Sequence, residues 1–404
     1  MSEPLVVIGN GMAAARFVEE LDARARGRYA IAVIGAEPCL AYNRVLLSSL
    51  LAGEVCNEEI ELKSAEWWRS RGVTLLYGSS AQAIDTATKE VRLGGGHVLP
   101  YGKLVLATGS NAIRLDIPGA GLPNVMTFRD LADVEKISSA ALRSRRAVGI
   151  GGGLLGLEAA TGLAKHGITV TLLHLMPHLM ERQLDPHGAE LLKKAVESKN
   201  IEVLLEADTA AIEGDARVTG VRLEDGRVID TGLVVMALGV RPSIALAKAA
   251  GLQTARGIVV NDSLATSAAD VFAIGECAEH RGVCYGLVEP AYEQARVLAE
   301  RLAGRDTLYE GSTLSTNLKV SGVGVFSAGT IGRGDDGEQI VLSDPSAGIY
   351  KRLVLKNDRL AGAVLLGDTA DSLWYLDLIR SGESVARFRN DLAFGRALAV
   401  REAA

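Results

Sequence analysis

The sequence predicts an α/β protein with two βαβ units, each opening on a glycine turn, and a smaller α+β domain at its C-terminal end. Three observations lead to this prediction. The stretch VIGNGMAAA (6–14) is an apolar run followed by glycines and small helix-forming residues, and IGGGLLGLE (150–158) repeats that order. From Ser312 the chain changes to short strand-like runs separated by Asn-Asp and Gly turns, and we take Thr307 onward as a separate domain.

The composition is that of an ordinary globular protein with several domains. Of its 404 residues, 48% are hydrophobic and 23% are charged. A chain of this length is too long for a single hydrophobic core. Its net charge of -6 argues against a nucleic-acid binder, which normally carries a basic face. No apolar run reaches the roughly 18 residues that span a bilayer, and the start MSEPLVVIGNG lacks the basic region of a signal peptide. We therefore expect a cytoplasmic protein that binds neither nucleic acid nor membrane.

The four cysteines show no Cys-x-x-Cys spacing; they are Cys39, Cys56, Cys277 and Cys284. Reduced thiols are the expectation for such a pattern. We expect Cys277 to be a buried packing thiol, with an approach to the cofactor as the alternative. No set of histidines and cysteines has metal-ligand spacing, so we assign no metal.

The first βαβ unit begins with a strand at 5–8 and ends with a strand at 29–34. The helix between them is predicted by apolar residues spaced i, i+3, i+4 and i+7. These residues are Ala14, Phe17, Val18 and Leu21. The glycine turn therefore stands at a helix N-terminus.

The second unit repeats this order with strands at 146–150 and 169–173. Its predicted helix face consists of Leu157, Ala160, Thr161 and Ala164, and Gly167 is expected to terminate the helix. Further along we expect a helix over 185–199, a strand at 201–205 and a hairpin turning at Asp225-Gly226. A last helix is expected near 372–379.

The two turns have the pattern that cradles a dinucleotide. The first glycine allows the tight turn, the second lets the backbone approach a pyrophosphate, and the third small residue lets helix and strand pack closely. The residues concerned are Gly9, Gly11 and Ala14 in the first turn and Gly151, Gly153 and Gly156 in the second. Because both turns lie between a strand and a helix, we expect the chain to bind two dinucleotides.

The residue after the second strand of such a unit often reads the adenosine ribose. In the first unit Glu37 is placed to accept from the ribose, with a solvated turn glutamate as the alternative. In the second unit the equivalent place holds His174, which neither binds a 2′-hydroxyl nor repels a 2′-phosphate decisively. Arg182 either reaches a phosphate or is a surface residue. The choice between NADH and NADPH therefore stays open.

Three further motifs occur in order, namely LVLATGS (104–110), ALGVRP (237–242) and DVFAIGEC (270–277). With the glycine turns they resemble the flavoproteins that have two dinucleotide-binding domains. The resemblance implies two Rossmann-like domains, one for FAD and one for NAD(P), plus a C-terminal α+β domain. The implied boundaries are 1–113 and 240–306 for FAD, 114–239 for NAD(P) and 307–404 for the C-terminal domain.

The resemblance also implies the residues that contact each cofactor. For FAD they are Arg44, Ser48, Thr108, Gly109, Gly275, Glu276, Glu289 and Pro290, beside Gly9, Gly11, Ala14 and Glu37. For NAD(P) they are Glu158 and Gly239, beside the second glycine turn, His174 and Arg182. Glu276 stands where the family has Asp, which keeps the acceptor and lengthens the side chain. Glu158 is expected near the nicotinamide, with an ordinary helix-surface glutamate as the alternative, and we assign no residue an acid–base role.

A narrower resemblance rests on four segments, AYNRVLLSSLLAGE (41–54), HLMPHLMERQLD (174–185), GECAEHRG (275–282) and STNLKVSGVGVFSAG (315–329). They are similar to the flavoprotein portion of NAD(P)H nitrite reductase large subunits and to the electron-transfer subunit of assimilatory nitrate reductases. The large subunits continue into an iron–sulfur and sirohaem portion, whereas the scattered cysteines here cannot ligate a usual cluster. We therefore expect a reductase module that hands electrons on.

The segment after the second strand distinguishes this chain from two other branches of the family. Disulfide reductases place cysteines there, but the chain has YNRVLL (42–47), so thiol chemistry is not expected. Rubredoxin and ferredoxin reductases have a lysine where this chain has Ser49.

The resemblance implies a hydride transfer from NADH or NADPH to FAD, followed by electron transfer to a redox protein. The leading hypothesis is a nitrate- or nitrite-reducing partner. The alternatives are rubredoxin or ferredoxin as the partner, or a non-catalytic flavoprotein that signals by nucleotide binding. A monomer and a homodimer are both compatible with the sequence.

Overall fold

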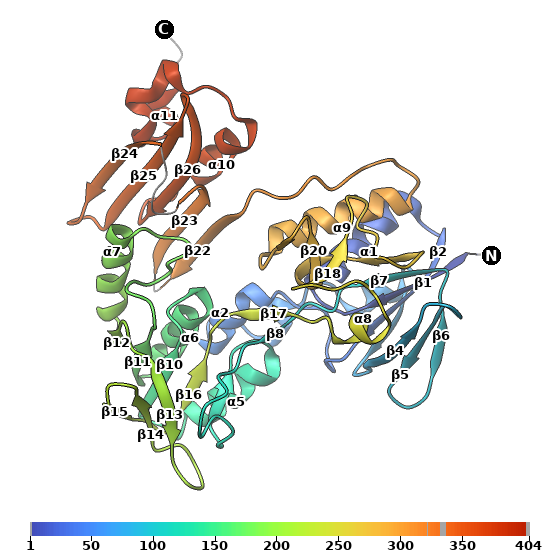
Figure 1. The fold of residues 1–404 in the computed structure, drawn as a ribbon, viewed down its shortest axis with the longest axis horizontal. Coiled ribbons are helices and arrows are strands. Elements are labelled where there is room, and N and C mark those ends of the chain that lie inside the picture. Colours follow the sequence, from blue (N-terminus) through green and yellow to red (C-terminus); the bar gives the residue numbers. More distant parts are fainter. Residues whose placement is uncertain (1, 321, 332–336, 401–404) are drawn as a thin grey trace. The chain divides into compact units, whose positions relative to one another are not determined.

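The computed structural model of the chain describes residues 2–320, 322–331 and 337–400; Ser321, inside the 315–329 motif, lies outside them. The chain forms two compact units (Figure 1). Unit 1 consists of Met1–Leu46, Val55–Asn111 and Val240–Ser312, and unit 2 of Leu47–Glu54, Ala112–Gly239 and Thr313–Ala404. The assignment of three domains to their cofactors stays a prediction. No helix within the described residues has the length and apolarity needed to cross a bilayer.

Unit 1 is built on a parallel sheet. Its strands, in spatial order, are β19 (Val271–Ala273), β7 (Lys103–Leu106), β1 (Glu3–Ile8), β2 (Tyr29–Gly35) and β3 (Thr74–Tyr77). Helix α1 (Met12–Ala25) follows β1 directly and packs against α9 (Val288–Leu302), as Figure 1 shows in blue and gold. The predicted helix face is confirmed, because Ala14, Phe17 and Val18 are fully buried and Leu21 is 1% exposed. Each such apolar side chain larger than alanine contributes about 1.5–3 kcal/mol through burial.

Smaller elements complete unit 1. They are the antiparallel strands β4 (Ala81–Asp85), β5 (Glu90–Leu93) and β6 (Val98–Pro100), the strands β18 (Ile258–Val260), β20 (Ala278–His280) and β21 (Val283–Cys284), and the helices α3 (Asn57–Ile60), α4 (Ala65–Arg69) and α8 (Ala245–Ala249). Short 3-10 helices cover Arg44–Leu46 and Gly275–Cys277. Strands β8 (Ser110–Ala112) and β17 (Val240–Pro242) pair with each other, and the chain changes unit within β8 and directly before β17.

Unit 2 contains a second parallel sheet. Its strands, in spatial order, are β12 (Ile201–Leu204), β11 (Thr169–Leu173), β10 (Arg146–Ile150), β16 (Val234–Met236) and β9 (Val125–Thr127). The helices beside it are α2 (Leu47–Leu51), α5 (Leu131–Ala141), α6 (Leu154–Lys165) and α7 (Pro186–Glu197). An antiparallel sheet adds β13 (Thr209–Glu213), β14 (Gly220–Leu223) and β15 (Val228–Asp230). The strands predicted at 146–150 and 169–173 are confirmed to the residue.

The predicted core face of α6 is wrong in part. Leu157 and Ala160 are buried, but Thr161 and Ala164 are only half-buried and line a pocket. The residues that pack inward beside Leu157 and Ala160 include Ala159 and Leu163. Helix α6 packs against the sheet on one side and against helix α2 on another. The spacing of apolar residues along the sequence does not show which of these two partners each side chain contacts.

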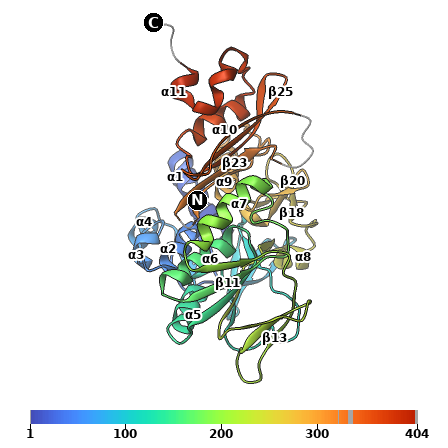
Figure 2. The same ribbon diagram turned by 90° about the vertical axis from the view of Figure 1, so that its left-hand side faces the viewer.

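The C-terminal part of unit 2 is an antiparallel sheet with helices, which confirms the predicted α+β texture. The spatial order is β22 (Ser315–Val320), β23 (Val323–Gly329), β26 (Arg359–Leu366), β25 (Ile349–Lys356) and β24 (Glu338–Asp344). Helix α10 (Ser372–Ser381) packs on β26, and a 3-10 helix (Ala386–Phe394) and α11 (Arg396–Ala399) follow it. Helix α7 also contacts β26, and Figures 1 and 2 show it beside this sheet.

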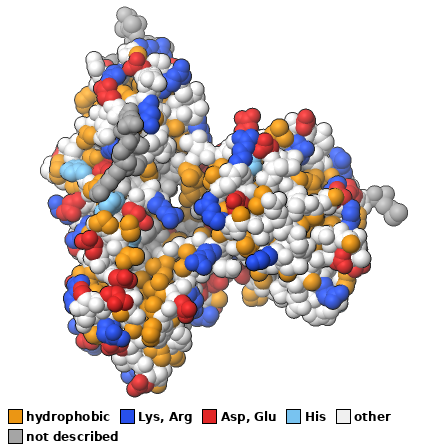
Figure 3. Space-filling model, in the orientation of Figure 1, with side chains coloured by type: hydrophobic (Ala, Val, Ile, Leu, Met, Phe, Trp, Pro, Cys, Tyr) orange, Lys and Arg blue, Asp and Glu red, His pale blue; other side chains and the backbone are white. Residues whose placement is uncertain are grey.

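On the face seen in Figure 3, acidic, basic and hydrophobic side chains are interspersed. This mixture agrees with a composition in which 43 Lys and Arg residues stand against 49 Asp and Glu residues. The glycine turns, rather than a charged surface, therefore mark the candidate site.

Candidate functional site

The first glycine turn joins β1 to α1 and has the geometry that a bound pyrophosphate requires. Gly9 has φ +117°, and a Cβ there would lie 2.0 Å from the Ala107 carbonyl oxygen, so only glycine fits. Gly11 is the N-cap of α1, makes no side-chain cap, and has nothing within 4 Å of an added Cβ. Ala14 is fully buried beneath the turn. The first amides of α1 therefore face open space, which suits an anion.

The second turn, between β10 and α6, has the same construction. Gly151 has φ +120°, and an added Cβ would lie 2.4 Å from the Ala237 carbonyl oxygen. Gly153 is the N-cap of α6 and has nothing within 4 Å of an added Cβ. At Gly156 a Cβ would lie 1.7 Å from the Gly151 carbonyl oxygen, so the third glycine permits the close contact of helix and turn. This site also fits a dinucleotide.

Two residues expected at the FAD, Glu37 and Arg44, lie together in unit 1. The Tyr42 hydroxyl donates to the Glu37 carboxylate over 2.7 Å, and Arg44 forms an ion pair with the same carboxylate. The Arg44 guanidinium also lies over the Tyr42 ring, 4.8 Å from its centre. Burial by itself would lower the pKa of Arg44, but its acidic and phenolic neighbours hold that pKa above the ordinary value. The cluster holds Glu37 in one place after β2.

The segments after β7 and β19 bring more of the expected FAD residues close to one another. Thr108 donates to the Ser243 carbonyl over 2.8 Å, and Gly109 has φ +66°. The Ser110 hydroxyl donates to Glu276 over 2.8 Å. Glu276 therefore keeps a hydrogen-bonded carboxylate at the position where the family has Asp.

Gly275 and helix α9 lie next in this region. The Gly275 N–H, at φ +79°, donates to the Gln294 side chain over 2.7 Å. Gln294 is fully buried on α9, and the sequence pattern does not single it out, since a buried glutamine on a helix has no local signature. Glu289 lies in the first turn of α9 and is exposed, whereas Pro290 is buried. Gln294 thus fixes the backbone at the Gly-Glu segment.

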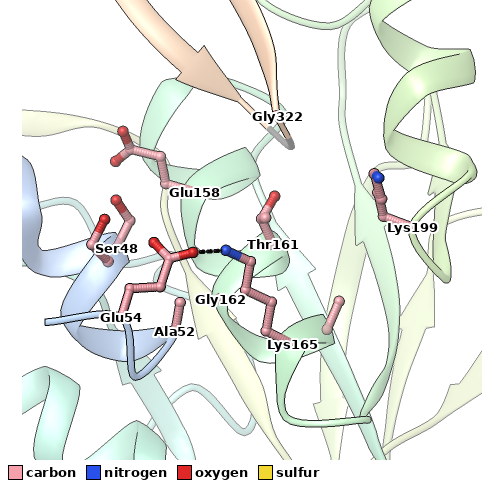
Figure 4. A pocket seen from close by; sticks show the side chains of 11 residues that line it. Ser48, Ala52, Glu54, Glu158, Thr161, Gly162, Lys165, Lys199 and Gly322 are labelled. Carbon is pink, nitrogen blue, oxygen red and sulfur yellow. Dashed lines mark hydrogen bonds and ion pairs between the residues drawn. The ribbon is translucent and has the colours of Figure 1, made fainter.

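Ser48 and Glu158 belong to unit 2, where both line a pocket of about 560 Å³ between α2 and α6 (Figure 4). The figure shows Glu54 and Lys165 joined as an ion pair in this pocket. Glu158 makes no hydrogen bond or ion pair with the residues that the structure describes, and burial raises its pKa to about 7. The pocket is of the size that small ligands occupy.

Gly239, expected at the nicotinamide nucleotide, lies just before β17 and has φ +98°. The Gly239 carbonyl accepts a hydrogen bond from the Ile113 N–H over 3.0 Å. A glycine is therefore required at the point where the chain leaves the second parallel sheet.

His174 lies directly after β11 and is 7% exposed. It accepts from the Gly152 N–H through Nδ1 over 3.0 Å, and its Nε2 lies 3.1 Å from a carboxylate oxygen of Glu181. Glu181 was not predicted as a site residue, because a residue in a loop seven positions after His174 has no fixed spatial relation to the strand end. Arg182 is exposed and makes no ion pair with the described residues.

Cys277 is fully buried, as expected of a packing thiol, and burial raises its pKa. Its Sγ lies 3.4 Å from the Leu106 carbonyl oxygen. A thiol in this setting is a poor nucleophile.

The comparisons with known proteins agree with this geometry. Residues 3–297 match the model of the pyridine nucleotide-disulphide oxidoreductase family, and residues 315–383 match the rubredoxin NAD+ reductase C-terminal domain. The chain is 44% identical over 383 residues to the nitrite reductase [NAD(P)H] of Bacillus subtilis. It is 42% identical over 374 residues to the assimilatory nitrate reductase electron transfer subunit of the same organism. These alignments cover 95% and 92% of the chain but only 48% of each relative, so the chain spans about half their length.

A solved structure supports the same fold. The covalent putidaredoxin reductase–putidaredoxin complex contains a chain that superposes with a TM-score of 0.88 at 26% identity, covering 99% of both chains. These findings confirm the predicted class, an oxidoreductase that uses FAD and a nicotinamide nucleotide. The chain belongs to the pyridine nucleotide-disulphide oxidoreductase family and carries the C-terminal domain of rubredoxin reductases.

Proposed function

We propose that this chain is an FAD-dependent reductase that oxidises NADH or NADPH and passes the electrons to a redox protein in nitrate or nitrite reduction. The observation that carries the proposal is a pair of helix N-termini, at Gly11 and Gly153, with no protein atom within 4 Å of an added Cβ. Each helix follows a parallel strand and a turn whose first glycine has no room for a side chain. Held at the first glycine turn, FAD would supply the chemistry that links a two-electron hydride donor to a one-electron acceptor. The relatives named for nitrite and nitrate reductases support the choice of acceptor.

The residues of each unit have separate roles in this proposal. In unit 1, α1 binds the FAD pyrophosphate, while Glu37 and the Ser110-bound Glu276 accept from its hydroxyl groups. In unit 2, α6 binds the pyrophosphate of the nicotinamide nucleotide, and Ser48 and Glu158 line the pocket at its side. Glu158 positions the nicotinamide amide rather than supplying a proton to the reaction.

Rubredoxin or ferredoxin is the second candidate acceptor. It is favoured by the match of residues 315–383 to the C-terminal domain of rubredoxin reductases. Neither acceptor requires a second redox centre on this chain. The protein acts in the cytoplasm in either case, as a monomer or a homodimer.

The acceptor is tested with the anaerobically reduced protein in a stopped-flow instrument. Purified sirohaem-containing nitrite reductase, nitrate reductase, rubredoxin and ferredoxin are added separately, and the return of the oxidised flavin spectrum is followed. The proposal predicts fast reoxidation by a nitrite- or nitrate-reducing protein, faster than by rubredoxin or ferredoxin. Equal and slow reoxidation by all four proteins contradicts it.

A further inference from the structure

The turn after β10 is held by a side chain at the strand end, where an acid binds the ribose in many dinucleotide-binding folds. The Gly152 N–H donates to His174 Nδ1 over 3.0 Å. Because a backbone N–H can only donate, Nδ1 is the acceptor, and the ring proton resides on Nε2. Nε2 therefore donates, and its partners are the Glu181 carboxylate and the His178 carbonyl, each at 3.1 Å.

The loop that carries Glu181 is fixed to the same turn. The Met180 N–H donates to the Gly152 carbonyl over 3.0 Å, so both polar groups of Gly152 are bound by this loop and His174. Leu179 and Met180 are fully buried, and Met180 has φ +50°. Glu181 follows Met180 directly. The position of Glu181 beside the second glycine turn is thus fixed by the buried side chains of Leu179 and Met180, which precede it, and by the hydrogen bond from His174 to its carboxylate.

The imidazole also fills the space beside the turn. A Cβ on Gly152 would lie 2.5 Å from His174 Cγ, whereas a Cβ on Gly153 would meet nothing within 4 Å. The pyrophosphate of a dinucleotide therefore has access to Gly153 and the first turn of α6. The space on the other side of the turn, next to the end of β11, is occupied by His174. The acidic group at this side is the Glu181 carboxylate, whose side chain is 31% exposed.

Arg182 would have the opposite effect on a nucleotide with a 2′-phosphate. It is exposed, and the described residues offer it no ion pair that would fix it toward the turn. Glu181, in contrast, is held by a hydrogen bond to a buried ring. Of these two neighbouring charged side chains, Glu181 is therefore the one whose position is fixed by a hydrogen bond.

We propose that Glu181 selects NADH over NADPH, and that His174 is the residue that positions it. The inference rests on the proposed function, since it concerns the nicotinamide nucleotide of that reductase. The Glu181 carboxylate accepts from the ribose hydroxyl groups, and its charge repels a 2′-phosphate. His174 keeps the carboxylate in place through Nε2–H while Nδ1 closes the turn.

The test measures binding as well as turnover, on the FAD-loaded protein. Dissociation constants for NAD+ and NADP+ are measured by titration calorimetry, and kcat/KM is measured for NADH and NADPH with an artificial acceptor. The variants are Glu181→Gln, Arg182→Ala and, as a matched loss of one exposed carboxylate in the same unit, Glu190→Gln. The wild-type protein is expected to bind NAD+ at least about tenfold more tightly than NADP+. Glu181→Gln is expected to reduce that ratio about tenfold, mainly through tighter NADP+ binding, and Glu190→Gln to leave it unchanged.

His174 is tested by rescue. His174→Ala is expected to reduce the nucleotide ratio as Glu181→Gln does, with the FAD content and flavin spectrum unchanged. His174→Gln, which retains a donor toward Glu181, is expected to restore part of the ratio. If His174→Gln and His174→Ala give the same ratio, the positioning role is wrong.

Two results would overturn the inference and separate it from the proposed function. A wild-type preference for NADP+, or a ratio that changes in Arg182→Ala and not in Glu181→Gln, contradicts the role of Glu181 alone. If the flavin spectrum is normal but neither nucleotide binds, the proposed function fails together with it.

Discussion

The Tyr350 hydroxyl on β25 donates to the Asp185 carboxylate over 2.9 Å. The same carboxylate caps helix α7, accepting from the His187 and Gly188 N–H groups over 3.0 and 3.1 Å. Arg352, which is 8% exposed, adds its charge 3.9 Å away. The C-terminal sheet therefore holds the first turn of α7, directly after the loop that carries Glu181.

Replacing Tyr350 with Phe should lower the stability of unit 2. The variant removes one partly buried hydrogen bond to a carboxylate and should cost about 1–2 kcal/mol in free energy of unfolding. Differential scanning calorimetry on the FAD-loaded protein measures the change. Tyr77→Phe, at a 53% exposed side chain in unit 1, is the matched control and should leave the unfolding temperature unchanged. Equal effects of the two variants would contradict the role of the Asp185 contact.

Glu158 should make stability depend on pH. Burial raises its pKa from 4.5 to about 7, so between those pH values the folded protein keeps a proton that the unfolded chain releases. Stability from this group is therefore full below about pH 4.5 and falls as the pH rises through 7, by up to about 3 kcal/mol.

The comparison that isolates this contribution is Glu158→Gln against the wild-type protein, with Glu190→Gln as an exposed control. The difference in unfolding temperature between Glu158→Gln and wild type should grow in favour of the variant from pH 5 to pH 8. A difference that stays constant over this range would show that Glu158 is ionised throughout.

Replacing Gly11 with Ala should separate cofactor binding from folding. Gly11 has φ -107°, which any residue adopts, and an added Cβ meets no protein atom within 4 Å. The apoprotein should therefore be as stable as wild type, while the methyl group obstructs the pyrophosphate and weakens FAD binding at least about tenfold. Flavin content and calorimetry of the apoprotein measure the two effects. The control variant is Gly121→Ala, whose added Cβ also meets no atom within 4 Å, and it should bind FAD normally. An equal loss of FAD in Gly121→Ala would contradict a specific role of Gly11 in binding the pyrophosphate.

Cys277 should be dispensable for electron transfer. Its thiol is fully buried, and burial raises its pKa, so it is not poised as a nucleophile. In Cys277→Ala the rate of flavin reduction by the preferred nucleotide should stay within about twofold of wild type, with a stability loss of about 1 kcal/mol. Loss of flavin reduction in a folded, FAD-loaded variant would indicate that the thiol takes part.

The elements that local patterns specify were predictable from the sequence. The strand at 146–150 is apolar with a glycine turn at its end, and Gly167 terminates α6 with φ +77°, as expected of a C-terminal glycine. Strand β24, over Glu338–Asp344, was not predicted, because an edge strand with largely exposed side chains lacks a strong apolar pattern.

The parts of the site that depend on loops were not predictable. His174 could be placed at a strand end from its sequence position, but its bonds to Gly152 and Glu181 depend on how the loop before α7 folds back. Likewise, the sequence placed 47–54 with the first βαβ unit, whereas α2 belongs to the compact unit of the second. Contacts between segments far apart in the chain determine both features.

The proposed function requires that a nicotinamide nucleotide reduces FAD bound to this chain. The most direct measurement is anaerobic stopped-flow mixing of the FAD-loaded protein with NADH and, separately, with NADPH, followed through the visible flavin absorbance. The proposed function, together with the role of Glu181, predicts rapid and complete bleaching by NADH and much slower bleaching by NADPH. A protein that holds FAD but is reduced by neither nucleotide would contradict it and favour a flavoprotein that signals by binding alone.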